Sequence, residues 1–550
     1  MNQVDPLLAR VAVHGSPFEI GTHNGLRQFV NAPQDLNQLI ESARAHGDKT
    51  FIVEGTRRLT FNEVFAWRDR LVAQLAISRG DRVAICMRNR AEWMVAFLAV
   101  VRAGGVAALL NSRGSPQELV AMIEEVSPSL VIADSERAVL IRQGNFTGRI
   151  IDLMQPLAEA ETVGAAKINV MPELGAAMPD DPCTILFTSG TTGQVKGAVL
   201  SHRNLITGLL SVQLSGVMIM HAMADRYKMP VANLMASLPQ QAVLLVYPLF
   251  HISGLGSAFL SPMFAGSKIV IMRRWDAREA LKLIANERIT MFTGVPTMLW
   301  DVLRSARLEG ADLSTLTNVA SGGQALPVNL LNEMRAAFPQ AAMGTGYGMT
   351  ECAGAVAQLL GDDFNRMPSS AGRVLPVAEM HTLGADDTVL PQGETGEITV
   401  RGAMVMKGYW NRPEESAAVL SPDGWLRTGD IGYVDEEGFV FIVDRKKDMV
   451  ISGGENIFCA EVERAMGELD GLTECAAFGI ADERLGELLV AVVVAEGLTE
   501  ADIIREVADR LARYKAPGRV AFAREALPRN AVGKVDKIAL RARWAEMIGN

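Results

Sequence analysis

The sequence predicts an α/β protein in which a large N-terminal domain precedes a small α+β C-terminal domain. Nearly continuous apolar segments, such as residues 83–86 and 130–132, alternate with helical segments, which indicates two parallel-sheet subdomains covered on both faces. Residues 373–443 change to short alternating strands between glycine-rich turns, which indicates a small β-barrel-like subdomain. A charged run at residues 444–448 follows directly.

This charged run predicts the boundary between the two domains. The N-terminal domain is expected to span residues 1–443, because the sheet patterns end there. Residues 449–550 carry a separate α+β pattern, which indicates a second domain. We therefore expect residues 444–448 to be a hinge that joins the two domains.

Composition excludes several classes of protein. The 550 residues are 49% hydrophobic and 21% charged, which is sufficient for several globular cores. A net charge of −10 offers no basic surface, so nucleic acid is not expected as a partner. The five cysteines lack C-x-x-C spacing, which argues against a disulfide framework and a zinc site. Residues 1–21 show no basic segment followed by an apolar one, and we expect a cytoplasmic protein.

Two capping boxes predict helix starts in the first subdomain. Thr60 and Glu63 begin an amphipathic helix, which we expect to end at Gly80. Residues 115–118, Ser-Pro-Gln-Glu, begin another with proline at the first helical position. The longest apolar stretch, residues 94–110, is interrupted by an arginine and two glycines, so it predicts a helix, a turn and a strand and no transmembrane segment.

The second parallel-sheet unit is expected from about residue 244 to residue 347, where apolar strands again alternate with helices. Residues 214–241 precede it and are rich in methionine and alanine without a clear period. We expect an inserted helical or mobile segment there.

A loop rich in hydroxyls and glycines follows the apolar segment 184–187 and contains a single lysine. Hydroxyls can donate to phosphate oxygens, glycines let backbone N–H groups approach an anion, and the lysine supplies a positive charge. The loop lacks the Gly-Lys-Ser/Thr ending of a Walker A sequence, which disfavours a P-loop nucleotidase. The predicted phosphate-binding residues are Thr188, Ser189, Gly190, Thr191, Thr192 and Lys196.

Seven further motifs follow this loop in order. They are Tyr-Pro-Leu-Phe-His at 247–251, Gly-Val-Pro-Thr at 294–297, Ser-Gly-Gly-Gln at 321–324, Gly-Tyr-Gly-Met-Thr-Glu at 346–351, Arg-Thr-Gly-Asp at 427–430, Ser-Gly-Gly-Glu-Asn at 452–456, and Pro-Arg-Asn-Ala-Val-Gly-Lys at 528–534. With this order and spacing, the chain resembles the adenylate-forming acyl-CoA synthetases, whose superfamily includes peptide-synthetase adenylation domains and luciferases. The resemblance covers nearly everything from about residue 35 to 540.

The resemblance implies a ligase that converts a carboxylic acid and ATP into acyl-AMP and pyrophosphate and then transfers the acyl group to CoA. ATP, Mg²⁺ and CoA are therefore the expected cofactor and cosubstrates. Glu351 is expected to bind Mg²⁺ and Thr350 the α-phosphate. A carboxylate beside a phosphate chain is chemically sensible when a hard cation lies between them.

The resemblance also assigns the adenosine site. Tyr347, with Gly348 beside it, is expected to stack on adenine, and Asp430 and Arg445 are expected to bind the ribose. The expected residues on the other side of the adenine ring are Gly322, Gly323 and Gln324.

Residues near and beyond the charged run are expected to serve both half-reactions. By resemblance, Lys534 holds the substrate carboxylate and the α-phosphate during adenylation, and Lys447 is the residue about which the C-terminal domain rotates. Gly453 and Gly454 are expected to line the channel for the pantetheine arm, and His251 lies between this channel and the acid pocket.

The acid pocket is expected to be apolar and rich in glycine. By resemblance its walls are His251, Ile252, Thr293, Gly294, Gly323, Gly344, Gly346 and Met349. Position 346 is glycine where malonyl-CoA synthetases have arginine, which disfavours a dicarboxylic acid. Small residues leave a deep slot, so we expect a medium- or long-chain fatty acid, with an aryl acid of the cinnamate or benzoate type as the alternative.

Other functions share parts of this pattern. An adenylation enzyme that loads a carrier protein would have the same ATP motifs, and a luciferase-like oxygenase could use the same fold. A non-catalytic nucleotide-binding protein is disfavoured, because Lys196, Glu351, Asp430 and Lys534 occur together. Both monomers and homodimers occur in the family, and either is expected here.

Overall fold

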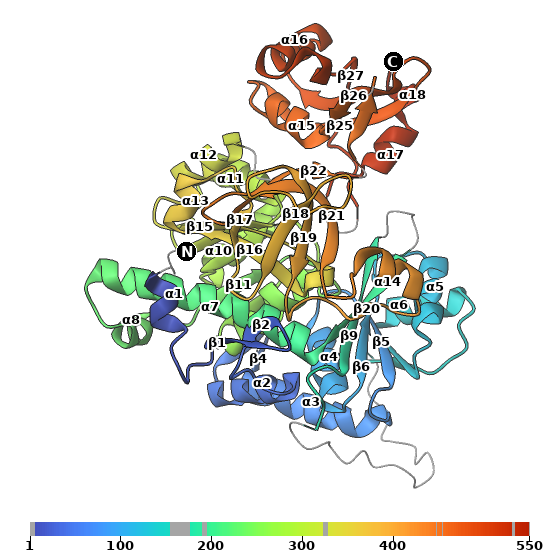
Figure 1. The fold of residues 1–550 in the computed structure, drawn as a ribbon. Coiled ribbons are helices and arrows are strands. Elements are labelled where there is room, and N and C mark those ends of the chain that lie inside the picture. The colour runs from blue at the N-terminus through green and yellow to red at the C-terminus, as the bar shows by residue number, and fades with distance from the viewer. Residues whose placement is uncertain are drawn as a thin grey trace.

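A computed structural model of the chain describes residues 6–154, 176–189, 195–322, 328–446, 448–453, 455–530 and 534–548. These residues form a large body, and a smaller C-terminal body lies against one end of it (Figure 1). Two large mixed sheets with helices against them make up the large body, which confirms the predicted α/β class.

The first sheet has seven strands in the order β20-β10-β9-β6-β5-β7-β8. Strands β5 to β9 are parallel to their neighbours within this group, whereas β10 is antiparallel to both β9 and β20. Both predicted apolar strands, β5 and β7, lie near one edge of the sheet. The bounds are β5 Arg82–Cys86, β6 Val106–Leu109, β7 Leu130–Ala133, β8 Ile150–Asp152, β9 Pro182–Ser189, β10 Val195–Ser201 and β20 Gly408–Tyr409.

The second sheet has thirteen strands and a parallel half, β3-β12-β11-β13-β14-β15. Strand β4 is antiparallel at one edge of this half, and β16 is antiparallel at the other. The bounds are β3 Thr50–Glu54, β4 Arg57–Thr60, β11 Ala242–Leu245, β12 Lys268–Ile271, β13 Met291–Gly294, β14 Asn318–Gly322, β15 Ala342–Met349 and β16 Gly354–Leu360.

The short strands predicted within residues 373–443 continue this second sheet. They hydrogen-bond in series through β17 onto β16, so the barrel-like unit is not a separate sheet. Strand β22 runs on to Arg445 and thus passes residue 443, where we expect the domain boundary. The bounds are β17 Gly372–Val374, β18 Glu379–Leu383, β19 Gly396–Arg401, β21 Leu426–Val434 and β22 Phe439–Arg445.

Helices pack against both sheets and begin where the sequence predicts. Both capping boxes are present, at Thr60 and at Ser115. The first of these helices, α3, ends at Leu75 and not at Gly80, because Ala76 takes a left-handed conformation with φ of 48°. The helices beside the first sheet are α4 Ala91–Arg102, α5 Pro116–Val126 and α6 Ser135–Gln143, whereas α3 Phe61–Leu75 contacts β3 and β4 of the second sheet, and both α3 and α2 Leu36–Ser42 pack on α4. Those beside the second are α10 Ala277–Asn286, α11 Pro296–Glu309, α12 Val328–Ala337 and α13 Asp362–Arg366.

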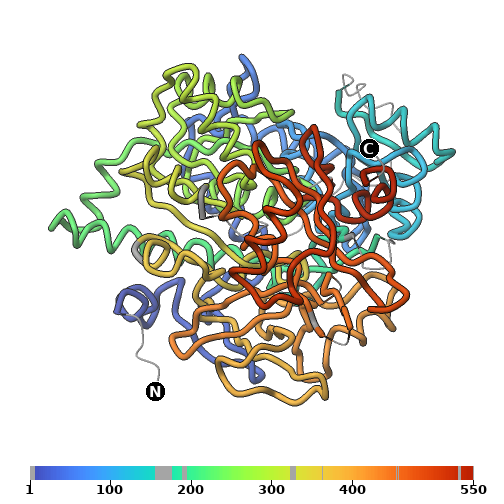
Figure 2. The backbone as a smooth tube through the Cα atoms, turned by 90° about the horizontal axis from the view of Figure 1, so that it is seen from above, coloured from blue at the N-terminus to red at the C-terminus, as the bar shows by residue number. Residues whose placement is uncertain are grey.

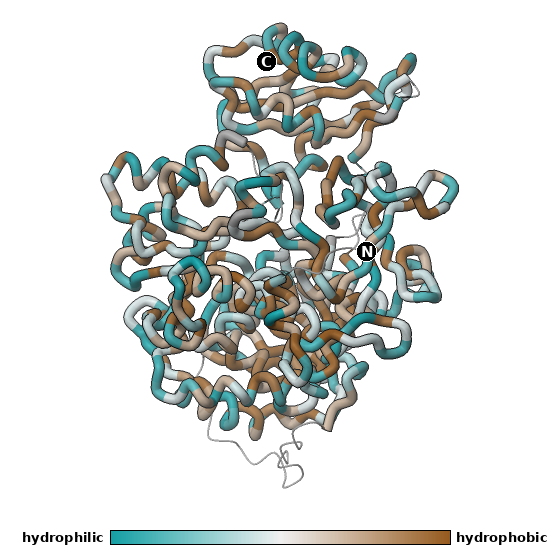
Figure 3. Tube along the Cα trace, turned by 60° about the vertical axis from the view of Figure 1, so that its left-hand side comes forward, coloured by the Kyte–Doolittle hydropathy of each residue, from teal (hydrophilic) through white to brown (hydrophobic). Residues whose placement is uncertain are grey.

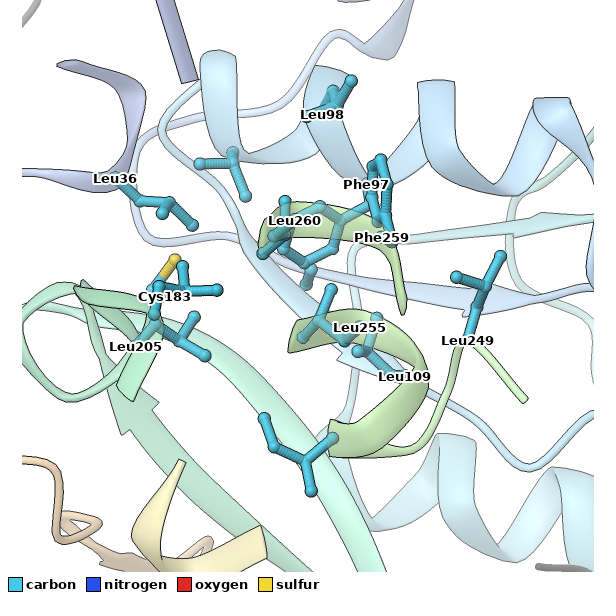
Figure 4. Packing of buried hydrophobic residues seen from close by; sticks show 14 of the residues in the cluster. Leu36, Phe97, Leu98, Leu109, Cys183, Leu205, Leu249, Leu255, Phe259 and Leu260 are labelled. Carbon is cyan, nitrogen blue, oxygen red and sulfur yellow. The ribbon is translucent and has the colours of Figure 1, made fainter. Parts of the chain in front are cut away.

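The main hydrophobic core lies where elements of the two sheets meet. Phe97 of α4 packs edge-to-face on Phe259, at 6.2 Å between ring centroids, and Leu109 and Leu205 lie close by (Figure 4). Phe259 belongs to a π-helix, Ser253–Leu260, that follows β11. Apolar residues gather in the interior of the large body, and its outer turns are mainly polar (Figure 3). This shared core joins the two sheets into one unit.

The C-terminal body has its own sheet and its own apolar clusters. It covers part of the large body when the molecule is seen from above (Figure 2). Its strands are β23 Val450–Ser452, β24 Glu455–Ile457, β25 Leu472–Asp482, β26 Gly486–Ala495 and β27 Arg519–Phe522, and its helices are α15 Cys459–Gly467, α16 Glu500–Arg510, α17 Lys537–Ala542 and α18 Trp544–Ile548. This arrangement confirms the predicted small α+β unit.

The segment 214–241 is helical, in agreement with one of the two predicted possibilities. It is the second half of the long helix α7, His202–Tyr227, followed by α8, Val231–Ser237. The two helices project from the large body beside α1, Pro6–Val11, and Arg10 of α1 pairs with Asp225 of α7 (Figure 1). Among the described residues, α7 is the one helix that is long and apolar enough to cross a membrane, and half of its most apolar window is buried inside the protein.

The remaining elements are short. They are β1 Ile20–His23 and β2 Leu26–Phe29, which pair with each other, the short helices α9 Ser261–Phe264 and α14 Pro413–Val419, and the 3₁₀ turns Ala43–His46, Thr350–Cys352 and Arg513–Lys515. All five cysteines are free, as their spacing predicts.

Gly208 of α7 packs directly on the turn that carries Thr350 and Glu351. A Cβ added to Gly208 would lie 2.5 Å from the carbonyl oxygen of Ala353, whereas one added to Gly216 of the same helix would meet nothing within 4 Å. We therefore expect Gly208→Ala to destabilise the protein by about 1–3 kcal/mol through overpacking. The matched change Gly216→Ala should stabilise it by roughly 0.5–1 kcal/mol, because alanine favours the helix.

Thermal unfolding of the two variants measures this difference. The expected result is a lower midpoint for Gly208→Ala and an equal or higher midpoint for Gly216→Ala. Similar gains in both variants would contradict the close contact between α7 and this turn.

Candidate active site

The carboxyl ends of three parallel strands bring most predicted site residues to one edge of the second sheet. Strand pairing sets Gly294 of β13 opposite Ser321 of β14, and Gly322 opposite Gly346 of β15. The segment with His251 follows β11, which is parallel to β13 and lies in the same sheet. Open α/β sheets bind ligands at such an edge.

Tyr347, Asp430 and Arg445 form one connected group at this edge. The Tyr347 hydroxyl donates to Asp430 Oδ2 at 2.7 Å, and Arg445 Nε lies 2.9 Å from Asp430 Oδ1. Asp430 is only 2% exposed, whereas Tyr347 is half-buried, so part of its ring is accessible. Burial and the adjacent Asp430 raise the pKa of Tyr347 well above its ordinary value. Each carboxylate oxygen keeps a lone pair for a further donor such as a ribose hydroxyl.

The predicted phosphate loop connects two antiparallel strands, β9 and β10. Thr188 and Lys196 stand opposite each other at its two ends. This strand–turn–strand setting differs from the strand–turn–helix of a P-loop, in agreement with the sequence prediction. The structure does not describe the side chain of Ser189. The predicted site residues that lie wholly outside the described residues are Gly190, Thr191, Thr192, Gly323, Gln324, Lys447 and Gly454.

Glu351 and Lys196 are both in contact with Tyr409, a residue that the sequence analysis missed. The Tyr409 hydroxyl donates to Glu351 Oε1 at 3.0 Å, and Lys196 Nζ lies 5.2 Å from the centroid of its ring. Thr350, beside Glu351, is buried. Tyr409 is far from both partners in sequence, and only the pairing of β20 with β10 brings it beside Lys196. A local pattern in the sequence carries no signal of that pairing.

The chemistry of Glu351 fits a magnesium ion. Among the described residues, no three acidic, histidine or cysteine side chains gather as a metal site of their own. Mg²⁺ is commonly held by one or two carboxylates together with substrate phosphates. Glu351 has one oxygen that accepts from Tyr409 and a second oxygen with no hydrogen bond of its own among those found. A single carboxylate beside a phosphate-binding lysine therefore suits magnesium that arrives with a nucleotide.

The charge of Lys534, in the C-terminal body, reaches His251 in the large body. Burial is the larger cause and the positive charge of Lys534 the smaller one, and together they lower the pKa of His251 to about 4. The imidazole is therefore neutral at neutral pH, and its Nδ1 accepts from the backbone N–H of Ser253 at 3.3 Å. Asn89 fixes the preceding loop, since its side chain donates to the Tyr247 carbonyl and accepts from the N–H of Leu249.

The predicted acid-pocket residues differ in the space beside them. Ile252 is buried, and Thr293 and Met349 are half-buried. Gly344 is not the open slot that we expected, because a Cβ there would overlap the Leu360 side chain. Gly346 does have room, since the nearest atom to an added Cβ is the Ala357 oxygen at 3.5 Å.

Two other predicted glycines have clear backbone roles. Gly348 lies where β15 approaches β16 so closely that an added Cβ would overlap the backbone of Gly354. Gly453 has a φ of 60° in the turn between β23 and β24, and its N–H donates to the carbonyl of Leu485. A left-handed turn of this kind favours glycine. The backbone conformation therefore explains a glycine at position 453 independently of the channel that we predict.

Known families match both bodies of the chain. Residues 39–410 match the family described as AMP-binding enzyme, and residues 461–534 match the AMP-binding enzyme C-terminal domain. The chain belongs to the AMP-binding enzyme family. Both bodies of the chain thus correspond to parts of a known family.

Curated members of the AMP-binding enzyme family support acyl-CoA ligase chemistry. A feruloyl-CoA synthase from Amycolatopsis sp is 34% identical over 518 residues, which are 92% of this chain and 98% of the relative. The long-chain-fatty-acid–CoA ligase FadD13 of Mycobacterium tuberculosis (strain ATCC 25618 / H37Rv) is 32% identical over 501 residues, 89% of this chain and 94% of the relative.

Solved structures of this family are similar along the whole chain. The o-succinylbenzoate CoA synthetase MenE of Bacillus subtilis, in complex with the acyl-adenylate intermediate OSB-AMP, has a TM-score of 0.76 and 30% identity, with 92% of this chain and 97% of that one covered. MenE has also been solved with ATP and a magnesium ion. ATP-bound MatB from Rhodopseudomonas palustris has a TM-score of 0.76 and 29% identity, with 92% and 99% covered.

The electrostatic effect of Lys534 on His251 can be tested through the pKa of His251. In Lys534→Gln the positive charge is lost, so the pKa of His251 should rise from about 4 toward its ordinary value. Carbon-13 labelling of the histidines followed by a pH titration in NMR measures this pKa.

The control is Lys515→Gln, because Lys515 lies in the same body and pairs with Glu461 at 2.7 Å. This variant should leave the pKa of His251 unchanged. An unchanged pKa in Lys534→Gln would mean that the two residues do not meet in solution.

Proposed function

We propose that the chain activates a medium- or long-chain fatty acid with ATP and transfers the acyl group to CoA. A carboxylate oxygen of the acid attacks the α-phosphorus of ATP, and the bond from this phosphorus to the bridging oxygen of pyrophosphate breaks. The thiol sulfur of CoA then attacks the carbonyl carbon of the acyl-AMP. AMP leaves with the electron pair, the thiol proton is released, and a thioester results.

Charge is the main obstacle to the first step. An anionic carboxylate must approach a triphosphate, so cations must lie around the reacting phosphorus. Lys196 and Lys534 would supply two of these charges from this chain. Mg²⁺, when bound through Glu351, would neutralise further negative charge on the phosphates.

The observation that carries the proposal is that Tyr347, Asp430 and Arg445 form one connected group, while Glu351 and Lys196 both contact Tyr409. Lys534 lies within electrostatic reach of His251. The lysine belongs to the C-terminal body, and the histidine to the loop after β11. A neutral His251 adds no second positive charge beside Lys534. We therefore propose that this arrangement serves adenylation, and that rotation about Lys447 opens the site to CoA through the channel beside Gly453 and Gly454.

The apolar character of the predicted acid pocket supports a fatty acid. Ile252 and Met349 contribute apolar walls, and Gly346 leaves the volume of a side chain free. The second candidate is an aryl-acid CoA ligase. It is favoured by the names of three relatives, which are a feruloyl-CoA synthase, an indoleacetate–CoA ligase and a 4-coumarate–CoA ligase. A medium-chain or aryl acid would also suit the fact that Gly344 adds no open space.

The role of Lys534 can be tested in the two half-reactions separately. Lys534→Ala should reduce acid-dependent pyrophosphate exchange by a factor on the order of 10² or more, because a positioned cation is lost from a step in which negative charges gather. Formation of the thioester from supplied acyl-AMP should continue. Lys515→Ala is the control and should leave both half-reactions near the wild-type rates. Adenylation by Lys534→Ala at nearly the wild-type rate would show that this assignment is wrong.

The acid can be identified by a series of chain lengths. Each buried methylene contributes roughly 0.8 kcal/mol, so kcat/KM should rise several-fold per carbon until the slot is full. Gly346→Leu should stop this rise at a shorter acid, while Gly346→Ala, whose Cβ fits, should shift it little. The KM for ATP is the control and should change little in both variants. A flat series with strong turnover of cinnamate or benzoate would contradict the fatty-acid proposal and favour the aryl acid.

A further inference from the structure

The segment 406–410 lies between the two strongest charges of the predicted phosphate site. At one end, the N–H of Met406 donates to the carbonyl of Glu351 at 2.8 Å. At the other end, the N–H of Trp410 donates to the carbonyl of Gly197, next to Lys196, at 2.7 Å. The segment therefore ties the turn that carries the carboxylate to the strand that carries the lysine.

The side chain of Tyr409 also contacts both Glu351 and Lys196. Its hydroxyl donates to Glu351 Oε1, and the ammonium of Lys196 lies over the face of its ring. The hydroxyl has a single proton, so this hydrogen bond orients the carboxylate. An ammonium over an aromatic ring is attracted by the negative face of the ring.

Glu351 and Lys196 form no ion pair with each other within the part of the chain that the structure describes, although Glu351 contacts the hydroxyl of Tyr409 and Lys196 the face of its ring. A direct ion pair would partly cancel both charges. The phenol gives each charge a separate partner. The lysine then stays available to a phosphate, and the second carboxylate oxygen stays available to a cation.

A series of hydrogen bonds that begins at the backbone N–H of Tyr409 holds this residue in one position. Its N–H donates to Ser416 Oγ at 2.8 Å, and Ser416 Oγ donates to the carbonyl of Arg412 at 2.6 Å. Arg412 in turn forms two hydrogen bonds of 2.9 Å with Glu125 of α5, beside the first sheet. The phenol is thus fixed to both the first sheet and the turn of Glu351.

We propose that Tyr409 is a positioning residue that keeps Lys196 and Glu351 apart and correctly oriented for a nucleotide with its divalent cation. The proposal rests on the adenylation function proposed above. In this role Tyr409 acts through its two partners. Residues that orient a metal ligand typically change metal affinity about 10–100-fold when they are lost.

Two substitutions separate the hydroxyl from the ring. Tyr409→Phe keeps the ring below Lys196 and removes only the donor to Glu351. Tyr409→Leu removes both and allows Lys196 to pair with Glu351. Tyr433→Phe is the matched control, because the Tyr433 ring stacks on Phe441 at 4.7 Å in strands β21 and β22, and no hydrogen bond of its hydroxyl was found.

Binding of Mn²⁺, as a substitute for Mg²⁺, to the enzyme with a non-hydrolysable ATP analogue is measured by electron paramagnetic resonance. Tyr409→Phe should weaken this binding about 10–100-fold, while its KM for ATP at saturating Mg²⁺ stays close to that of the wild type. Tyr409→Leu should weaken Mn²⁺ binding as well and should also raise the KM for ATP. Tyr433→Phe should behave as the wild type in both measurements.

The outcomes distinguish this inference from the proposed function. If the wild type shows no acid-dependent pyrophosphate exchange, the adenylation function is wrong. If the wild type is active and Tyr409→Phe binds Mn²⁺ as tightly as it does, the positioning role is wrong. Should Tyr409→Phe fail to fold, Ser416→Ala removes both the acceptor of the Tyr409 N–H and the donor to the Arg412 carbonyl, and wild-type Mn²⁺ affinity in that variant would equally overturn the proposal.

Discussion

The buried carboxylate of Asp430 is the interaction on which the rest of the site depends. It accepts from Tyr347 of β15 and pairs with Arg445 of β22, so it joins the parallel half of the second sheet to its antiparallel half. A charge that is almost fully buried is tolerated only when it has partners of this kind. The pairing of Asp430 with Arg445 across β21 and β22 also brings the adenosine site next to the predicted hinge.

Packing and strand pairing with distant segments hold Glu351 and Lys196 at the two ends of the predicted phosphate site. The turn with Glu351 is packed against α7 at Gly208, and the strand with Lys196 is paired with β20. The turn and the strand are both short. Contacts with distant segments therefore hold the charged side chains of Glu351 and Lys196 in position. The shared core, which joins both sheets, supports these contacts.

Local physical chemistry explains which features the sequence predicts well. Capping boxes, apolar strands and the charged run are local patterns, and the helix starts at Thr60 and Ser115 occur where these patterns lie. The predicted end of α3, at Gly80, was wrong by a few residues. The helix ends earlier because Ala76 takes the left-handed conformation. Tyr409 and the filled space beside Gly344 depend on partners distant in sequence, and no local pattern reveals them.

One described contact between the two bodies lies at Asp444, within the predicted hinge. Asp444 accepts from the N–H of Ala460 at the start of α15 and from the N–H of Arg445. Burial raises the pKa of Asp444 to about 6, because it disfavours the charged carboxylate more than these hydrogen bonds favour it. Because burial of the Asp444 carboxylate is unfavourable, its hydrogen bond with Ala460 is easily replaced by hydrogen bonds with water. The apolar clusters of the C-terminal body lie within it, so the proposed rotation about the hinge would leave them intact.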